Sequence, residues 1–572
     1  MPHPDAHPTL LIQRMAKRQA KTGMTIRASA SHDQFLAGDE LWQLAGRYRA
    51  GFLQRGLQRG DIVAIAQPTC AESMAAVIAA WSEGMAISFL PHDIAASNSR
   101  ITPEQFTQML ALLEPALLLT SRAVVPHIPG GLAEKILLQE ELSDWAAGIL
   151  PQSGPIKTSA GDLAVLQLTS GSTGQPKAVE ITQHMLSANC DAIASRVGAN
   201  RQDIMVSWLP LHHDMGLSAI TLAWWVDAQL ILIPTASYAR RPTIWLETIS
   251  NFRATLSPAP ASAYTLMTRF ADAFTNRALA LDSWRYAWAG AEPVHDKHVQ
   301  DFIRAFSRYG LSPSTVQPAY GMAETVVATS LNRPGKPYAI CWVDRAKLEL
   351  AGEVQAASAG APDAIALVSN GKAVDGVQIA VFDDAGNPCP TGRSGRLCIR
   401  GSSVIHRYHK QPVCLDQDGW FDTGDIGFLH NDEVYVCGRV KDLITRSGVN
   451  ASPYQIEWVV EELLALRPGS AAAFSYLDFS SHQERVVVLV VHTPSMDKEA
   501  ATSSRIAVEV SKRCGIQIDL VQYVTHSQIP KTTSGKIKRQ QLRQQFAQAR
   551  HSSPAAALQP QPHSNAEDLS SV

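Results

Sequence analysis

A repeated succession of strand, helix and strand most constrains what this chain can fold into. Residues 61–67 predict a buried strand, residues 71–84 a helix and residues 86–90 the next strand. Units of this kind form a parallel sheet that is covered by helices. The pattern continues in three further apolar runs, at 116–119, 203–209 and 229–233. We therefore predict an α/β fold whose large N-terminal part is built on parallel sheets.

The texture of the sequence changes near residue 365. Short apolar runs at 377–382, 396–399 and 434–437 alternate there with Gly-, Asp- and Pro-rich turns. Short strands joined by tight turns predict a small antiparallel, β-barrel-like subdomain. After about residue 440, helical and strand patterns alternate again, as in a compact α+β domain.

A chain of 572 residues is too long for a single hydrophobic core. The last twenty or so residues are rich in Ser, Pro, Ala and Gln, which is typical of disorder. We predict a large domain over 1–438 with its β-rich part at about 365–438, a small C-terminal domain over 439–551, and a disordered tail over 552–572.

Composition and charge exclude several classes of function. The net charge is −2 and the pI is about 6.8, so no nucleic-acid or membrane-surface footprint is indicated. The eight cysteines form no CxxC pair, and the N-terminus has no apolar signal region. The longest apolar stretch, 217–234, is interrupted by Asp227 and Gln229, which favours a buried helix and strand over a membrane span. We expect a cytoplasmic protein without nucleic-acid partners or membrane insertion.

Residues 169–177, Thr-Ser-Gly-Ser-Thr-Gly-Gln-Pro-Lys, carry the first chemical signal. Gly171 and Gly174 allow backbone N–H groups to approach an anion, the hydroxyls add donors, and Lys177 adds a cation. A strand-like run before the loop and an apolar run after it argue against a flexible linker. The spacing differs from the P-loop of kinases and GTPases. The pattern predicts a loop that binds a triphosphate.

Five further stretches follow this loop. Residues 208–217 read Trp-Leu-Pro-Leu-His-His-Asp-Met-Gly-Leu. A metal site is disfavoured here, because adjacent residues on a strand would point His212 and His213 to opposite faces. A lysine- and arginine-rich loop such as 530–539 is, on its own, usually a solvated surface or a nucleic-acid patch. The other three are Gly290–Val294 (GAEPV), taken together with its partner thirty residues on, Pro318–Thr325 (PAYGMAET), then Phe421–Phe428 (FDTGDIGF) and Gly438–Leu443 (GRVKDL).

Together, and in their order along the chain, the six stretches resemble the motifs of the adenylate-forming superfamily, which includes acyl-CoA synthetases, luciferases, peptide-synthetase adenylation domains and fatty acyl-AMP ligases. The LPxxHDMGL and GAEPV motifs are most similar to those of fatty acyl-AMP ligases. The resemblance spans residues from about 30 to 545. It departs at Ala178, where the family usually has glycine, and at Gly395-Arg-Leu397, where the family often has glutamate in the middle.

The resemblance implies a site for ATP and Mg²⁺. Adenine would stack on Tyr320, Asp425 would accept both ribose hydroxyls, and Arg439 would contact the ribose. Glu324, together with Thr169, would hold Mg²⁺ as a hard oxygen ligand, although a helix N-cap is the plainer interpretation of Glu324. The remaining implied nucleotide contacts are Ser170, Gly171, Ser172, Thr173, Gly174, Lys177, Gly290, Ala291, Glu292 and Gly321.

The resemblance also implies the reaction and its catalytic groups. A carboxylate would attack the α-phosphate of ATP, giving an acyl-adenylate and pyrophosphate. Lys536 would bridge the carboxylate and the α-phosphate, and His213 would lie beside the carboxylate. Lys441 would be the hinge of a mobile small domain. The acyl pocket would include Trp208, Met215 and Gly216.

The acceptor thiol separates the branches of the superfamily. The segment between Thr325 and Ser369 is longer than acyl-CoA synthetases usually have, and acyl-AMP ligases carry an insertion about there that disfavours CoA. The resemblance therefore implies a fatty acid substrate and an acyl carrier protein that arrives in trans. The alternatives are an ordinary surface insertion with CoA as the acceptor, or an amino-acid-activating enzyme that uses Asp214 for the substrate ammonium. An inactive scaffold is disfavoured, because the motif residues are intact.

Overall fold

The computed structural model describes residues 9–18, 23–29, 32–94, 96, 99, 101–170, 176–361, 363–446, 449–478, 483–492, 499–532 and 535–552. The chain divides into two compact units, Met1–Val440 and Lys441–Val572. The sequence had placed the end of the large domain at residue 438. Apart from Ser552, the predicted tail lies outside the described residues.

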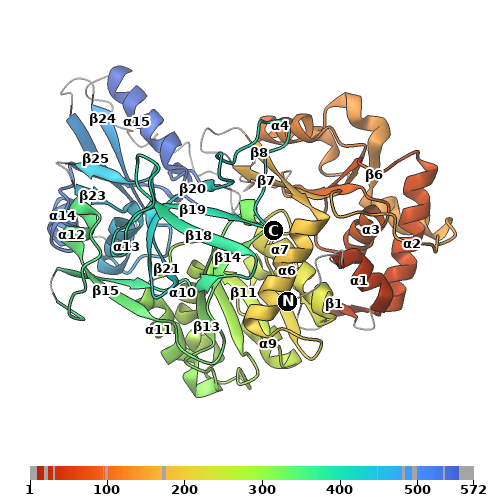
Figure 1. Cartoon of the computed structure of the whole chain (residues 1–572), viewed down its shortest axis with the longest axis horizontal. Helices are drawn as coiled ribbons and strands as arrows, with labels where there is room; N and C mark the ends of the chain where they lie inside the picture. Colours follow the sequence, from red (N-terminus) through yellow and green to blue (C-terminus); the bar gives the residue numbers. More distant parts are fainter. Residues whose placement is uncertain are drawn as a thin grey trace, which may run out of the picture. The chain divides into compact units, whose positions relative to one another are not determined.

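The first sheet of unit 1 has six strands and is nearly all parallel. Only its last strand runs antiparallel, to its neighbour β7. The order is β6 (Ile136–Leu138), β5 (Leu117–Thr120), β3 (Ile62–Ala66), β4 (Ala86–Phe89), β7 (Leu163–Ser170) and β8 (Pro176–Thr182). Helices α2 (Gly38–Gln54) and α3 (Ala71–Ser82) lie side by side next to it (Figure 1). The predicted strand–helix–strand unit is therefore β3, α3 and β4. Two further helices of this region are α4 (Pro103–Leu113) and α5 (Leu142–Ala147).

The second sheet of unit 1 has thirteen strands and changes character along its width. Its parallel half pairs β1 (Met24–Ser29), β10 (Gln229–Leu232), β9 (Ile204–Ser207), β11 (Leu256–Pro260), β12 (Tyr286–Gly290) and β13 (Val316–Gly321), with β2 (His32–Leu36) antiparallel at the edge. The helices that accompany this half are α1 (Leu11–Arg18), α6 (Gln183–Val197), α7 (Asp214–Val226), α8 (Thr235–Arg240), α9 (Ile244–Phe252), α10 (Ala261–Arg269) and α11 (Asp296–Phe306).

The antiparallel strands expected after residue 365 are present and continue this same sheet. Strand β14 (Ala328–Leu331) folds back on β13 with an irregularity between Tyr320 and Gly321. The hydrogen-bonded order then runs through β17 (Lys372–Ala373), β21 (Glu433–Arg439), β20 (Phe421–His430), β19 (Gly395–Gly401) and β18 (Val377–Phe382). One continuous sheet thus connects the parallel strands to the strands that carry the later motifs. The α/β fold with large sheets and a small α+β unit is confirmed.

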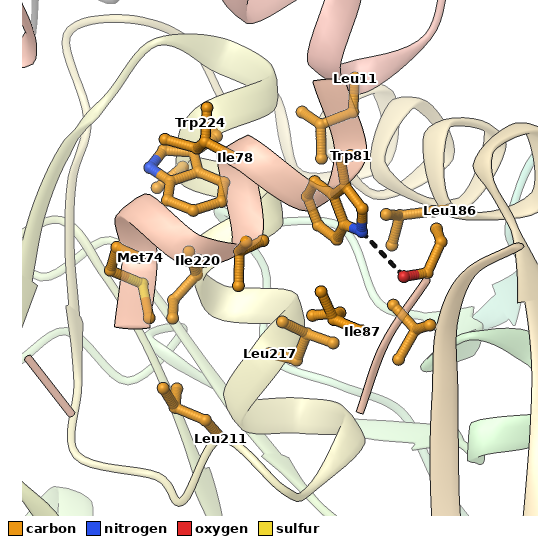
Figure 2. Close-up of a cluster of buried hydrophobic side chains, with 14 of the residues drawn as sticks. Leu11, Met74, Ile78, Trp81, Ile87, Leu186, Leu211, Leu217, Ile220 and Trp224 are labelled. Carbon is orange, nitrogen blue, oxygen red and sulfur yellow. Dashed lines mark hydrogen bonds between the residues drawn. The ribbon is translucent and has the colours of Figure 1, made fainter. Parts of the chain in front are cut away.

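A large apolar cluster fixes helix α7 in unit 1. Figure 2 shows Met74, Ile78 and Trp81 of α3 together with Leu217, Ile220 and Trp224 of α7. The indole N–H of Trp81 donates to the carbonyl of Ala164 (2.8 Å), so its one polar atom is satisfied. Each such side chain contributes about 1.5–3 kcal/mol when it is fully buried. Because α7 is anchored in this way, its N-terminus at His213 is well placed to build a site.

The segment of unit 1 over residues 340–368, where the sequence predicts an insertion, forms a small module of its own. Strands β15 (Ile340–Asp344) and β16 (Ala364–Val368) pair in antiparallel fashion around helix α12 (Arg345–Ala351). The side chain of Asp344 caps α12 by accepting from the N–H of Lys347 (3.0 Å). Val343 and Leu348 of the module pack with Phe428 and Tyr435 of β20 and β21. The module is thus attached to the large sheet through apolar contacts.

Unit 2 is a three-stranded sheet with helices. Strand β25 (Gln483–Val491) pairs antiparallel with β24 (Ala471–Asp478) and parallel with β26 (Leu520–Val524). The remaining elements of the unit are the hairpin β22 (Ile444–Arg446) and β23 (Val449–Ala451) and the helices α13 (Pro453–Leu463), α14 (Glu499–Cys514) and α15 (Arg539–Ser552). None of the helices in the described part of the chain is long and apolar enough to cross a membrane.

Candidate active site

Motif residues gather at one edge of the large sheet of unit 1. Trp208 follows β9, Gly290 ends β12 and Gly321 ends β13. These strands run parallel, so their carboxyl ends lie at the same edge. Such an edge is the usual ligand-binding position of open α/β sheets.

The chain is unusually tight where β13 ends. A Cβ atom on Gly321 would lie 1.7 Å from the carbonyl oxygen of Val327, so only glycine fits there. Val326 has a φ of 70°, and Ala291 after β12 has a φ of 62°. Positive φ is strained for both residues, most of all for β-branched valine. The edge of the sheet therefore carries backbone strain within the GAEPV stretch and directly after the PAYGMAET stretch.

Tyr320, Asp425 and Arg439 form a hydrogen-bonded chain in which Tyr320 and Asp425 are buried and Arg439 is exposed. The hydroxyl of Tyr320 donates to Oδ2 of Asp425 (2.8 Å), and Nε of Arg439 donates to Oδ1 (2.9 Å). Asp425 and Arg439 face each other on the paired strands β20 and β21. Burial, followed by the charge of Asp425, raises the pKa of Tyr320 well above its usual value, so the phenol stays a neutral donor. The three residues predicted to hold adenine and ribose are thus brought together.

The loop 169–177 lies at the turn between β7 and β8. Thr169 faces Lys177 across the hairpin, and Ser170 is the last residue of β7. Ala178, at the position where glycine was expected, is a buried residue of β8 that pairs with Leu168. The tip of the hairpin, with Gly171, Ser172, Thr173 and Gly174, lies outside the described residues.

Tyr408, which sequence reasoning missed, connects Lys177 to Glu324. Its hydroxyl donates to Oε1 of Glu324 (2.8 Å), and the Lys177 ammonium lies 4.6 Å from the centroid of its ring. Burial and the charge of Glu324 raise the pKa of Tyr408 above its usual value, so it remains a neutral donor. The N–H of His409 donates to the carbonyl of Ala178 (2.8 Å), which holds this segment on β8. No spacing in the sequence marks Tyr408, because it lies between the motifs.

Glu324 fits a role as a magnesium ligand. It lies in the short 3-10 helix Ala323–Thr325, whose N-cap is Met322, so the helix-cap interpretation of Glu324 does not describe its position. Tyr408 occupies Oε1, and no described residue bonds to Oε2. Within the described ranges, no group of three or more Asp, Glu, His or Cys side chains is arranged so that it could hold a metal ion. A site with one carboxylate suits Mg²⁺, which commonly takes its other ligands from phosphates and water.

His212 and His213 lie in a turn, and the expectation of a strand here is wrong. His213 is the N-cap residue of α7, and the ring centroids of the two histidines are 4.3 Å apart. Burial, then the neighbouring His213 and His92, lower the pKa of His212 well below its usual value. The carbonyl of His212 accepts from Nε2 of Gln167 on β7 (2.7 Å), which joins this turn to the first sheet. His212 is partly exposed in this turn, and its lowered pKa keeps it neutral.

The predicted acyl-pocket residues lie in and beside this turn. Trp208 stacks on Tyr238, with ring centroids 3.6 Å apart and planes at 10°. Trp208 and Met215 belong to the same apolar cluster. A Cβ atom on Gly216 would lie 2.1 Å from the carbonyl oxygen of Pro210, so glycine is needed for the turn to close. Tyr238 is a second residue that no motif predicted.

Glu292 organises the loop after β12. Its Oε2 accepts from the N–H of Ser262 at the start of α10 (2.9 Å). This bond joins the GAEPV stretch to the end of the neighbouring strand β11. The Glu292 carboxylate therefore holds this loop against the start of α10.

Lys441 and Lys536 both belong to unit 2. Lys441 is its first residue, and Lys536 is exposed on a hairpin that precedes α15. The loop around Lys536 is closed by a bridge between Lys531 and Ile537.

Comparisons with known proteins agree with this geometry. The family of AMP-binding enzymes matches residues 14–409. A protein of Mycobacterium tuberculosis named as a ligase, Rv1013, is 31% identical over 87% of this chain and 92% of its own length. The medium-chain-fatty-acid–[acyl-carrier-protein] ligase TtuA of Teredinibacter turnerae is 29% identical over 68% of this chain and 63% of its own.

A solved structure from work on fatty acyl-adenylate ligases of E. coli and L. pneumophila is also similar. It has a TM-score of 0.83 and 27% identity, covering 95% of this chain and 98% of the other. The family match covers more than half of the chain, and it includes the hairpin 169–177, Tyr320, Glu324 and Tyr408. This chain therefore belongs to the AMP-binding enzymes of the adenylate-forming superfamily.

Proposed function

We propose that this enzyme activates a fatty acid with Mg·ATP and passes the acyl group to the phosphopantetheine thiol of an acyl carrier protein supplied in trans. Adenylation of a carboxylic acid is the reaction of its family. The observation that carries the proposal is the pair of linked contacts at the end of β13. Tyr320 is bonded there to Asp425, and Glu324 is bonded to Tyr408 beside Lys177. Tyr320, which suits the nucleoside end of a nucleoside triphosphate, is thus four residues from Glu324, which suits the phosphate end.

The nucleoside would occupy the end with Tyr320. A carboxylate can accept from two adjacent hydroxyls, and Asp425 would do so for the ribose while Arg439 holds its other side. Gly290, Ala291 and Gly321 would leave room for the base, because they carry little or no side chain. The strain at Ala291 supports a role in the site, since strained backbone collects where ligands bind.

The phosphates would occupy the end with Lys177. The hairpin hydroxyls and the Lys177 ammonium would hold the β- and γ-phosphates. Glu324 and Thr169 would hold Mg²⁺, which would supply charge neutralisation at the phosphates. Tyr408 would keep Glu324 oriented toward this position through its hydrogen bond.

The acid would lie beside the turn that starts α7. His213 caps the helix there and would hold the reacting carboxylate, with Trp208, Met215 and Gly216 lining the acyl chain. Lys536 of unit 2 would approach the carboxylate and the α-phosphate as negative charge develops. Lys441 would be the hinge about which unit 2 turns between the two half-reactions.

The insertion β15–α12–β16 supports a carrier protein over CoA as the acceptor. It is a folded module with its own cap and its own apolar anchor, not an extended surface loop. The carrier-protein ligase among the relatives points the same way. Release of the acyl group to CoA remains the competing function.

Amino-acid activation is less well supported. Asp214 would have to receive the substrate ammonium, but its Oδ1 already accepts from the N–H of Met215 (2.7 Å) in the first turn of α7. A carboxylate at a helix N-terminus is stabilised in that position.

The adenylation half is tested by ATP–pyrophosphate exchange with a panel of acids. Medium- and long-chain fatty acids, aryl acids and amino acids are assayed separately with Mg·ATP. We expect exchange with fatty acids and no exchange above background with amino acids. Exchange with amino acids alone would contradict the proposed substrate class.

A further inference from the structure

The hairpin that carries Lys536 is joined to helix α15 through hydrogen bonds of its main chain. The N–H of Thr532 donates to the carbonyl of Lys536 (2.7 Å), and the N–H of Lys536 donates to Oγ1 of Thr532 (3.1 Å). The N–H of Lys538 donates to the carbonyl of Pro530 (2.8 Å), one residue before the helix begins at Arg539. The main chain at Lys536 therefore follows the position of α15.

Helix α15 is in turn fixed to the sheet of unit 2. Leu542 and Phe546 are buried in an apolar cluster with residues of β24 and β25. The rings of Phe546 and Phe474 meet edge to face with centroids 5.0 Å apart. The helix is thus a rigid support for the hairpin.

Arg543 of α15 reaches the main chain where unit 2 begins. Its Nη1 donates to the carbonyl of Lys441 (2.8 Å), and its Nη2 lies 3.3 Å and 3.5 Å from the carbonyls of Asp442 and Leu443. A planar guanidinium can serve several acceptors at once, which a lysine ammonium on a flexible stem does less well. Three consecutive carbonyls are thereby tied to one side chain.

Arg539, one helical turn earlier, reinforces this connection. Residues four apart lie on the same helix face, so both arginines point toward the start of unit 2. Nη2 of Arg539 bonds to both carboxylate oxygens of Glu457 (2.8 and 2.6 Å), and Nη1 lies 3.4 Å from Oδ2 of Asp442. The hydroxyl of Tyr454 donates to the same Asp442 oxygen (3.0 Å). Asp442 is therefore held through its side chain as well as its carbonyl.

We propose that Arg543 is a positioning residue that ties residues 441–443 to the helix carrying the Lys536 hairpin, so that these parts of unit 2 move as one body. A rotation of the main chain at Lys441 then moves the Lys536 hairpin by the same rotation. The consequence for catalysis rests on the proposed function, since that function assigns Lys441 and Lys536 their roles. The linkage itself rests only on contacts within unit 2.

The linkage is tested by the rate at which trypsin cleaves after Lys441, followed by mass spectrometry. The variants are Arg543→Ala and Arg543→Lys. Loss of hydrogen bonds to a charged donor should make local opening easier, so we expect about tenfold faster cleavage in Arg543→Ala. Arg543→Lys keeps one donor group and should fall between wild type and Arg543→Ala.

Arg513→Ala is the matched control. Arg513 lies on α14, bonds to Glu462 (2.8 Å) and stacks on Trp458 (4.5 Å), far along the chain from the hinge. We expect its cleavage rate after Lys441 to equal that of wild type. Equal rates in wild type and Arg543→Ala would overturn the proposal, and so would an equal increase in Arg513→Ala.

A kinetic readout separates positioning from general stability. At a temperature where circular dichroism shows each variant folded, kcat of pyrophosphate exchange should fall about tenfold in Arg543→Ala, with KM for ATP unchanged. Arg543→Lys should recover part of kcat. If Arg543→Ala is cleaved faster than wild type, but the wild-type enzyme shows no exchange with any acid, the proposed function fails while the linkage stands. Wild-type kcat in Arg543→Ala would overturn the positioning role.

Discussion

The proposed nucleotide site of unit 1 and the Lys536 hairpin of unit 2 are built in opposite ways. In unit 1, Asp425 is 4% exposed and is held by side chains from two strands, and Glu324 is held by Tyr408. In unit 2, Lys536 is exposed, and main-chain bonds around Thr532 set its position. The first arrangement suits a preorganised platform, in which charges and dipoles are fixed before the ligand arrives. The second arrangement, an exposed lysine on a hairpin, suits a cation that approaches such a platform and then moves away again.

Lys536→Ala should have the largest effect on catalysis. If Lys536 balances charge at the α-phosphate, as we propose, its removal should lower pyrophosphate exchange by about 10³-fold. ATP affinity, measured by calorimetry, should stay nearly unchanged, because the residues that we propose bind the nucleotide lie in unit 1. Lys512→Ala, an exposed lysine on α14, is the control. A fully active Lys536→Ala enzyme would contradict the claim that catalysis needs the Lys536 cation in addition to the preorganised groups of unit 1.

Asp425→Asn should weaken the platform itself. The amide cannot accept as strongly from the ribose hydroxyls or from Arg439, so KM for ATP should rise by about 10- to 100-fold. Asp422→Asn is a matched control on the same strand, since its carboxylate bonds to Arg396. Steady-state kinetics at varied ATP would detect the difference. Similar losses in both variants would speak against a specific ribose contact.

Tyr408→Phe should have a smaller effect that depends on magnesium. The variant keeps the ring beside Lys177 but loses the hydrogen bond to Glu324, so kcat should fall about tenfold. The Mg²⁺ concentration for half-maximal exchange should also change, because Glu324 is no longer oriented. Tyr408→Ala removes the ring as well and should be worse. A magnesium titration that matches wild type would rule out an orienting role.

Glu349→Gln should leave activity nearly unchanged but alter how stability depends on pH. Burial of this carboxyl in α12 of the insertion raises its pKa to about 7, although Arg345 opposes the shift. The folded state therefore binds the proton more tightly than the unfolded state. Its contribution to stability is complete below about pH 4.5 and is lost as the pH rises through about 7.

Urea unfolding at several pH values measures this contribution. Wild type should lose at most about 3 kcal/mol of unfolding free energy between pH 4.5 and 8, and Glu349→Gln should lose less. Glu353→Gln, at an exposed position paired with Arg393, is the control and should behave as wild type does. Identical pH slopes for all three proteins would contradict a buried, proton-binding Glu349.

Local patterns in the sequence predicted much of the fold. The strand–helix–strand unit at 61–90 is visible because a buried parallel strand is almost wholly apolar and its helix has a different period. The interrupted apolar stretch 217–234 was likewise interpreted correctly as a helix and a strand, since Asp227 lies between α7 and β10. Motif order then identified the superfamily, because a shared chemistry repeats the same residue types.

Contacts between distant parts of the chain could not be predicted in this way. Tyr408 meets Lys177 only because the segment around it pairs with β8, more than two hundred residues earlier. The turn at His212 and His213 was misjudged because an apolar run precedes it and the helix cap at His213 carries no capping side-chain bond. Arg543 lies outside every motif. It bonds to main-chain carbonyls, which every residue carries, so the residue types in the sequence do not identify its partners.

The central claim is best tested by the identity of the acylated product. The enzyme is incubated with Mg·ATP and its preferred fatty acid, then with CoA or with a phosphopantetheinylated acyl carrier protein, and the products are read by mass spectrometry. The account predicts acyl-AMP that accumulates in the presence of CoA and is consumed when the acyl-carrier thioester forms, with the carrier lacking phosphopantetheine as the control. Acyl-CoA formed as fast as acyl-AMP would contradict it and place the enzyme among acyl-CoA synthetases.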